Sequence, residues 1–292
     1  MPMPPTDPTD PTASGAANAL LAEVGRLDSV VVAYSGGVDS TLVLAASLRA
    51  LGPSRTLAAT ADSPALARDE LTLVRRTAAE LGAELAVLTT DELAVPGYRA
   101  NAGDRCYFCK RTVLAAVSEL AAARGYAHVA TGTHRDDHRS GHRPGLRAAR
   151  ERGIAEPLAT AGLGKAQVRA VAREWGLAAA DKPGTPCLAS RIAVGVPVTR
   201  QRLELVERAE AALREFLGDL RAPVRDLRVR ILAGTFRVEL DATAHRWLAG
   251  RPEQGAELLD RIGRTVGLGG GVLEPYRPGS VSTAASPGGG PR

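Results

Sequence analysis

Hydrophobic runs of strand length and longer runs of helix length alternate along the first two thirds of the chain. The strand-length runs are apolar and rich in β-branched residues: SVVVAYS (29–35), RTLAATADS (55–63), ELAVLTTDE (84–92) and YAHVATGT (126–133). The helix-length runs are TLVLAASLRALG (41–52), ALARDELTLVRRTAAELG (65–82), CYFCKRTVLAAVSELAAARG (106–125) and GKAQVRAVAREWG (164–176). Strands that alternate with helices of this length predict an α/β fold of parallel βαβ units, with helices covering both faces of the sheet.

The alternation of strand-length and helix-length runs ends after residue 195. A long charged helix over 199–221 is followed by two runs of period-two alternation, 226–234 and 235–241, which predict a β-hairpin. A further helix and a last strand follow at 252–267 and 270–277. We therefore expect a first α/β domain over 19–195 and a smaller α+β domain over 196–278. The ends, 1–18 and 279–292, are rich in Pro, Thr, Ser and Gly and are expected to be disordered tails.

Composition adds three expectations. Aromatic residues make up only 3% of the chain, so the core has to be built from Ala, Leu and Val. A net charge of +5 suits an anionic substrate or a nucleic acid without choosing between them. The chain shows neither a signal peptide nor a membrane-length apolar run, and its three cysteines are too few for a disulfide framework. We expect a soluble cytoplasmic protein with reduced thiols and no membrane association.

The segment that follows the first predicted strand has the composition of an anion-binding loop. Its residues are Ser35, Gly36, Gly37, Val38, Asp39 and Ser40. Backbone N–H groups at a helix N-terminus attract anions, the glycines allow a phosphate to approach closely, and the two serines add hydroxyl donors. The Walker pattern is absent because no lysine follows the glycines. A carboxylate beside phosphates needs a bridging cation, so Asp39 implies Mg²⁺.

SGGVDS resembles the pyrophosphate loop of the PP-loop ATP pyrophosphatases, which adenylate an oxygen atom of their substrate and release pyrophosphate. The resemblance implies a doubly wound, five-stranded parallel sheet with ATP at the carboxyl ends of its strands. It also places Asp62 and Ser63, after the second strand, near the adenosine. After the fourth strand it points to Gly132 and Thr133 for ATP, and to Asp136 or Asp137 as help in holding the metal.

The three cysteines occupy informative positions. Cys106 and Cys109 form a C-x-x-C pair, and this spacing puts both thiols on one face of a helix. Cys187 follows Pro183 and Pro186, with Lys182 and Arg191 close in sequence; a rigid turn among cations favours the reactive thiolate. Structural thiols, half of a zinc site, or three ligands of an iron–sulfur cluster are all compatible with this pattern.

Four segments together resemble the LarE family of sulfur transferases, which mature the nickel-pincer cofactor of lactate racemase. They are TADSPALARDEL, DRCYFCK, RPGLRAARERGIAEPL and DKPGTPCLASRI. The resemblance implies that ATP adenylates the carboxylates of a pyridinium-3,5-biscarboxylic acid mononucleotide and that sulfur then displaces AMP, with Cys187, Asp39 and Lys182 catalytic. The sulfur comes either from Cys187 itself or from a hydrosulfide on a [4Fe–4S] cluster held by Cys106, Cys109 and Cys187. We favour the cluster because all three cysteines are present.

The same resemblance implies that Arg228, Arg230 and Arg277 hold the phosphate of the substrate nucleotide and that the protein forms a homo-oligomer, a hexamer in this family. One loop departs from the family pattern. It reads GTHRDDHRSGHRPG, and His134 stands where the family has Asn. The change creates a series of His134, His138 and His142, which would share one face of a helix, but Gly141 argues against a continuous helix there.

Two other functions remain open. PP-loop tRNA-thiolating enzymes share SGGVDS and use cysteines in the same way, but the chain has no evident RNA-binding appendage, and we expect no nucleic-acid partner. A nucleotide-binding module without catalysis would bind ATP and release no pyrophosphate, and the presence of Asp39 and Cys187 argues against it.

Overall fold

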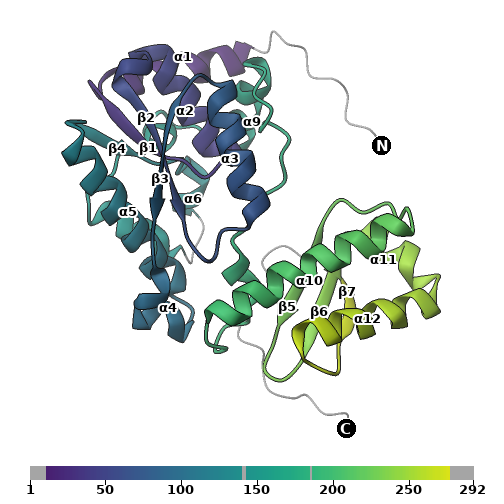
Figure 1. Ribbon diagram of the computed structural model, residues 1–292. Helices are drawn as coiled ribbons and strands as arrows, with labels where there is room; N and C mark the ends of the chain where they lie inside the picture. Colours follow the sequence, from purple (N-terminus) through teal and green to yellow (C-terminus); the bar gives the residue numbers. More distant parts are fainter. Residues whose placement is uncertain (1–10, 140–142, 185, 277–292) are drawn as a thin grey trace. The chain divides into compact units, whose positions relative to one another are not determined.

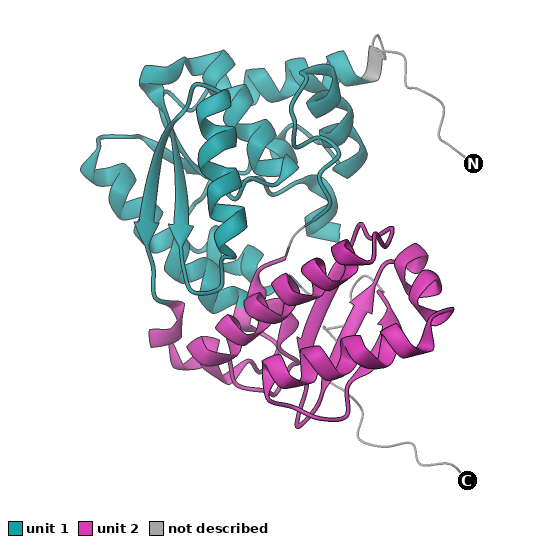
Figure 2. Ribbon diagram, turned by 45° about the vertical axis from the view of Figure 1, so that its right-hand side comes forward, with its two compact units in different colours: residues 1–91, 106–185 teal, residues 92–105, 186–292 magenta. Residues whose placement is uncertain are grey.

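The computed structural model describes residues 11–139, 143–184 and 186–276 (Figure 1). The chain divides into two compact units (Figure 2), one of residues 1–91 and 106–185 and the other of residues 92–105 and 186–292. None of the described helices is long and apolar enough to cross a membrane.

The first unit is built on a parallel sheet in the strand order β3-β2-β1-β4. Its strands are β1 (Val30–Ala33), β2 (Thr56–Asp62), β3 (Glu84–Thr89) and β4 (His128–Ala130). All four lie where the hydrophobic runs predict them, which confirms the α/β class. Beside β4 the described residues hold a single parallel bridge between Ala130 and Ala155. The sheet thus has four described strands and one bridge, and the expected count of five is not confirmed.

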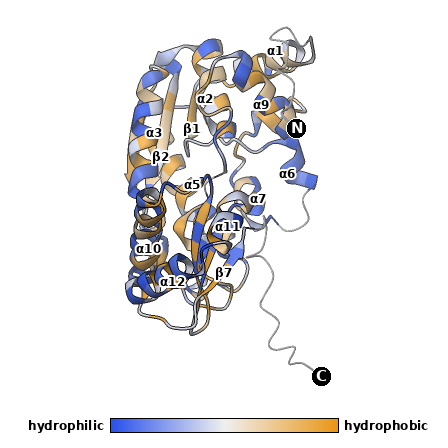
Figure 3. Cartoon of the chain, turned by 90° about the vertical axis from the view of Figure 1, so that its right-hand side faces the viewer, coloured by the Kyte–Doolittle hydropathy of each residue, from blue (hydrophilic) through white to orange (hydrophobic). Residues whose placement is uncertain are grey.

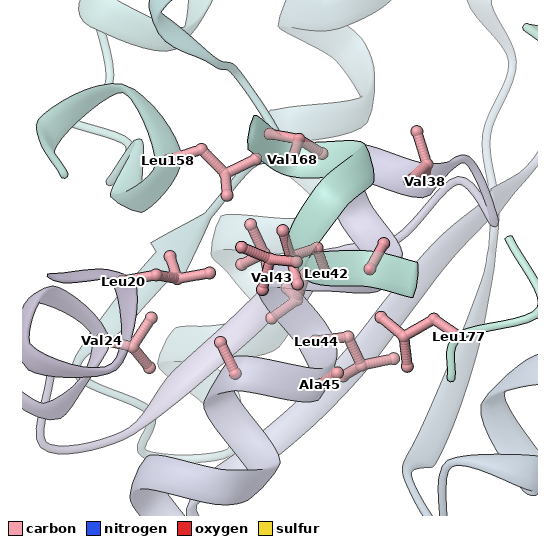
Figure 4. Packing of buried hydrophobic residues seen from close by; sticks show 14 of the residues in the cluster. Leu20, Val24, Val38, Leu42, Val43, Leu44, Ala45, Leu158, Val168 and Leu177 are labelled. Carbon is pink, nitrogen blue, oxygen red and sulfur yellow. The ribbon is translucent and has the colours of Figure 1, made fainter. Parts of the chain in front are cut away.

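Side chains of the sheet point alternately into two hydrophobic clusters. Val30 and Val32 pack with the helices α1 (Pro11–Gly25), α2 (Val38–Leu51) and α9 (Lys165–Glu174), and Figure 4 shows residues of all three helices in this cluster. Val31 faces the other way, against α5 (Arg105–Ala123). Figure 3 shows hydrophobic residues along β1 and β2 and mostly hydrophilic ones along α3 (Arg68–Glu80). Helices therefore cover both faces of the sheet.

Helix α1 corrects the expectation of a disordered tail through residue 18. The helix begins at Pro11, a residue type favoured in the first helical turn. Its buried side chains recur at helical spacing: Ala13, Ala16, Ala17, Leu20 and Val24. Three of these five side chains are alanines, which pack closely on α2 and α9 but give little hydrophobic signal in the sequence.

The second unit contains a three-stranded sheet in the order β5-β6-β7. The hairpin of β5 (Leu227–Ile231) and β6 (Phe236–Leu240) is antiparallel, as the alternation predicts, and β7 (Val272–Pro275) runs parallel to β6. The apolar side chains of the sheet form one cluster with α10 (Arg200–Asp219), α11 (Ala242–Ala249) and α12 (Pro252–Val266).

The division between the units differs from the expected domain boundary at residue 195. It falls at 185, and the segment 92–105 belongs to the second unit. This segment contains η2 (Glu92–Ala94) and α4 (Pro96–Ala100), and it is held by the buried side chain of Asn101. The Asn101 amide donates hydrogen bonds to the carbonyls of Ile192, Ala193 and Val196 at 3.4, 2.8 and 2.9 Å.

Short helices complete the chain. They are η1 (Pro53–Arg55), α6 (Arg135–Arg139), α7 (Pro144–Arg150), α8 (Pro157–Thr160) and η3 (Leu188–Arg191). The highly charged stretch 134–152 contains α6 and α7 within its described part.

Candidate functional site

The loop between β1 and α2 has the backbone form of an anion cradle. Gly36 adopts a φ of +69°, and a Cβ atom added there would lie 2.8 Å from a methyl group of Val74. Gly37 caps α2 in an extended conformation, and no side chain caps the helix. The first N–H groups of α2 are therefore left without a side-chain acceptor, which is the arrangement that binds phosphate.

The two serines of the loop have different surroundings. The Ser40 side chain is buried; its oxygen accepts a hydrogen bond from the Ser35 backbone N–H at 3.2 Å, and its hydroxyl donates to the Gly37 carbonyl at 3.2 Å. Ser35 is exposed, and its hydroxyl oxygen lies 3.1 Å from that of Ser40. Ser40 thus shapes the loop, whereas Ser35 presents a hydroxyl at its surface.

A lysine that the sequence analysis did not select binds the carboxylate of this loop. Lys165 donates from its Nζ to both Asp39 oxygens at 2.7 Å. Lys165 is the first residue of α9, and its backbone N–H donates to Asp136 at 2.7 Å. The only sequence signal is a lysine at the start of a predicted helix in the same βαβ domain.

A second lysine lies at the same loop. Lys182 donates to the Glu70 carboxylate at 2.6 Å and to the Gly36 carbonyl at 3.5 Å. Lys182 is close to Cys187 in sequence, but the structure places Lys182 in the first unit and Cys187 in the second. Lys165 and Lys182 together give the loop two ammonium groups, although no lysine occurs in the loop motif itself.

Residues that follow β4 pack directly against the loop. A Cβ atom added to Gly132 would lie 2.6 Å from the Ser40 backbone nitrogen and 2.8 Å from the Asp39 carbonyl carbon. Gly132 is therefore needed for close packing on the start of α2. Thr133 is buried, with its hydroxyl 3.1 Å from that of Thr131.

Asp62 and Ser63 lie at the carboxyl end of β2, the same end of the sheet as the loop. Asp62 forms an ion pair with Arg68 at 2.7 Å, and the Ser63 hydroxyl oxygen accepts a hydrogen bond from the Ala65 N–H at 3.2 Å. Parallel strands bring the ends of β1, β2 and β4 to one edge, so the structure gathers the expected ATP residues there.

The two candidate metal-binding aspartates after β4 already have partners. Asp136 accepts the Lys165 backbone N–H, and this hydrogen bond lowers the pKa of Asp136 below its ordinary value. Asp137 accepts the His134 N–H at 3.1 Å and pairs with Arg143 at 3.2 Å. Asp39 is also paired, with Lys165, but it lies within the anion loop itself, where its carboxylate oxygens suit a hard cation.

The histidine series does not converge in the described residues. His134 lies 3.5 Å from Asp137, and His138 contacts Glu156 at 2.7 Å. His142 lies outside the described residues. Within each unit, no group of three or more described His, Cys, Asp or Glu side chains is arranged to hold a metal ion.

Cys106 and Cys109 lie in the first turn of α5, one exposed and the other half-buried. Their spacing places both on one face of the helix, as predicted. Burial lowers the pKa of the neighbouring Lys110, whereas the nearby Cys109 acts in the opposite direction.

Cys187 lies in the second unit as the residue that precedes η3, and its side chain is exposed. Its carbonyl oxygen accepts hydrogen bonds from the Ser190 N–H at 2.9 Å and the Ser190 hydroxyl at 2.7 Å. Arg191 donates to the carbonyls of Pro186 and Cys187 and pairs with Glu210 at 2.8 Å. The Arg191 and Glu210 side chains are both buried, so a buried ion pair anchors the backbone that presents the thiol.

Arg228 and Arg230 share one face of β5, as the period of a strand predicts, and both are buried. Arg230 pairs with Glu239 at 2.7 Å. Arg228 stacks over the ring of Tyr276 at 3.7 Å and its Nη2 donates to Asp226 at 3.4 Å, whereas its buried Nη1 has no hydrogen-bond partner in the described structure. The third expected phosphate ligand, Arg277, lies outside the described residues.

Comparisons with known proteins bear on this arrangement. No protein-family model matches the chain. A pyridinium-3,5-bisthiocarboxylic acid mononucleotide synthase from Lactiplantibacillus plantarum is 34% identical over 76% of this chain and 78% of its own length. An uncharacterised protein from Synechocystis sp. is 41% identical over 74% of this chain and 78% of its own, and one from Methanocaldococcus jannaschii is 29% identical over 70% and 77%.

Proposed function

The chain belongs to the LarE family, and from this premise we propose that it is an ATP-dependent sulfur transferase acting on a pyridinium-3,5-biscarboxylic acid mononucleotide. Each of the two carboxylates becomes a thiocarboxylate. The observation that carries the proposal is the loop between β1 and α2, where uncapped helix N–H groups, Asp39 and Lys165 lie together. Similarity to a synthase of the bisthiocarboxylic acid product supports the choice of substrate.

The first step is adenylation. A substrate carboxylate oxygen attacks the α-phosphorus of ATP, the bond between the α-phosphorus and the bridging oxygen breaks, and pyrophosphate leaves with that electron pair. The N–H groups of α2 and the exposed Ser35 hydroxyl bind the pyrophosphate portion. Asp39 would hold Mg²⁺, which neutralises phosphate charge when it is bound. Lys165 then releases Asp39 and donates to the phosphates.

The second step is sulfur transfer. In one version the Cys187 thiolate attacks the acyl carbon, AMP leaves, and a thioester forms. Loss of the Cys187 α-proton with cleavage of its Cβ–S bond then gives the thiocarboxylate and leaves dehydroalanine. In the other version, a [4Fe–4S] cluster on Cys106, Cys109 and Cys187 would supply a hydrosulfide as the nucleophile. Both versions need a good leaving group on a weak electrophile, which adenylation provides.

The test is anaerobic incubation with ATP, Mg²⁺ and the biscarboxylic acid mononucleotide. We expect pyrophosphate and a thiocarboxylate product. A protein mass lowered by the elements of H₂S identifies Cys187 as the donor, whereas an unchanged mass together with an iron–sulfur absorbance identifies the cluster. If this incubation releases no pyrophosphate, the proposal is refuted. Cys106→Ser separates the versions further, because only the cluster version needs that thiol.

A further inference from the structure

One face of the three-stranded sheet in the second unit carries charged side chains, and some of them lie opposite a residue of the same charge. Its charged residues are Arg228, Arg230, Arg237, Glu239 and Glu274. Arg230 lies directly opposite Arg237, and Glu239 lies directly opposite Glu274. Like charges directly opposite each other destabilise a strand pair, but Arg228 lies directly opposite Glu239 and Arg237 pairs with Glu274 at 3.2 Å, so unlike charges offset these contacts.

Arg230 makes two different contacts at once. Its Nε donates to Glu239 Oε1 at 2.7 Å, and its Nη1 donates to the Ser190 carbonyl at 3.0 Å. The side chains of Arg230 and Glu239 are 7% and 2% exposed, so the pair is shielded from solvent. A guanidinium has donors in a planar fork and can hold a carboxylate and a carbonyl together. Arg230 therefore joins the sheet to the turn that contains Ser190.

Ser190 belongs to the turn that presents the candidate sulfur donor. Its N–H and its hydroxyl both donate to the Cys187 carbonyl, at 2.9 and 2.7 Å. Glu239, Arg230, Ser190 and Cys187 therefore form one continuous series of hydrogen bonds inside the second unit.

We infer that Glu239 and Arg230 are positioning residues that fix the Cys187 turn. Arg228, in contrast, stacks over Tyr276 and donates to Asp226 at 3.4 Å, so it lies outside this series. This inference rests on the proposed function, in which the Cys187 turn takes part in sulfur transfer.

The first test is the steady-state kinetics of Glu239→Gln, which removes the charge and keeps the size of the side chain. A positioning role predicts a kcat for thiocarboxylate formation that falls about tenfold or more, because a charge-assisted contact is lost. The substrate KM and the first-turnover burst of pyrophosphate should stay unchanged. If Glu239 instead restrains a phosphate ligand, the variant frees Arg230, and the KM falls at constant kcat. That outcome would overturn the inference.

The second test needs no turnover. Iodoacetamide labelling of Cys187, followed by peptide mass spectrometry, should be several-fold faster in Glu239→Gln than in the unchanged protein. Glu215→Gln is the matched control, because Glu215 pairs with Arg261 on the exposed side of α10, away from the series, and should label at the normal rate. Equal labelling of Cys187 in all three proteins would overturn the inference.

Arg230→Lys carries the test if Glu239→Gln does not fold. The lysine ammonium keeps the positive charge but lacks the planar fork that spans Glu239 and Ser190. We therefore expect a smaller fall in kcat and a smaller rise in the labelling rate of Cys187. A kcat and a labelling rate that both match the unchanged protein would count against the inference. Absence of pyrophosphate in the unchanged protein would refute the proposed function instead, and the labelling result would still stand.

Discussion

Replacing Gly132 with alanine tests whether the end of β4 shapes the anion loop. The new Cβ would lie 2.6 Å from the Ser40 nitrogen and 2.8 Å from the Asp39 carbonyl carbon. Ordinary contacts between such atoms are near 3.4–4 Å, so backbone has to move by roughly 1 Å. Neither side yields easily: the Thr131 N–H is bonded to Ala155 at 2.9 Å, and the start of α2 is buried.

Overpacking of this kind costs about 1–3 kcal/mol of unfolding free energy, and each kcal/mol lowers the Tm by roughly 2–4 °C in a domain of this size. Because the displaced atoms belong to the loop, ATP affinity should fall about tenfold or more, the equivalent of about 1.4 kcal/mol. Urea unfolding and calorimetric ATP titration measure the two effects.

Gly218→Ala is the control for the glycine substitution itself. Gly218 lies in α10, where an added Cβ would meet no atom within 4 Å, so this variant should gain about 0.5–1 kcal/mol and bind ATP normally. Gly132→Ala with unchanged stability and unchanged ATP affinity would refute the packing argument.

Three further predictions follow from single contacts. Glu210→Gln should lower the unfolding free energy by about 3–5 kcal/mol in urea, since it leaves the buried Arg191 charge without its partner; a loss below about 1 kcal/mol would contradict this. Burial acts to raise the pKa of Asp241, but four backbone N–H donors lower it overall. Asp241 therefore contributes stability above its unfolded pKa of about 4 that is lost as the pH falls through the lower folded value. Asp241→Asn should be less stable at pH 7 and lose less stability on acidification to pH 3, and equal acid sensitivity would count against the assignment. Lys165→Met should weaken ATP binding about tenfold by calorimetry, because a charged phosphate donor and the partner of Asp39 are removed, and unchanged affinity would exclude Lys165 from the site.

Much of the fold is predictable from local patterns. Strand-length apolar runs predict β1, β2, β3 and β4, and the two helix-length runs that end at Gly52 and Gly82 match α2 and α3, with both glycines at positive φ. SGGVDS was recognisable because a strand, a glycine loop and a helix start lie within a few residues, and the physical demand on Gly36 comes from its own backbone angle.

Features that depend on distant partners were not predictable in the same way. The alanines of α1 are marked as core residues only by packing on α2 and α9. Asn101 joins its segment to the second unit through carbonyls more than 90 positions away. The grouping of Lys182 with Cys187 rested on nearness in sequence, and the two residues belong to different units.

By itself, the sequence determined the α/β alternation, the anion loop and the positions of the three cysteines, because each depends on residues within one or two turns of the chain. Only the tertiary structure decided that Lys165 meets Asp39 across 126 positions and that Arg230 is neutralised by Glu239. The physical reason is that a side chain's charge and hydrogen-bonding capacity are set by its type, whereas the partner that uses them is set by packing.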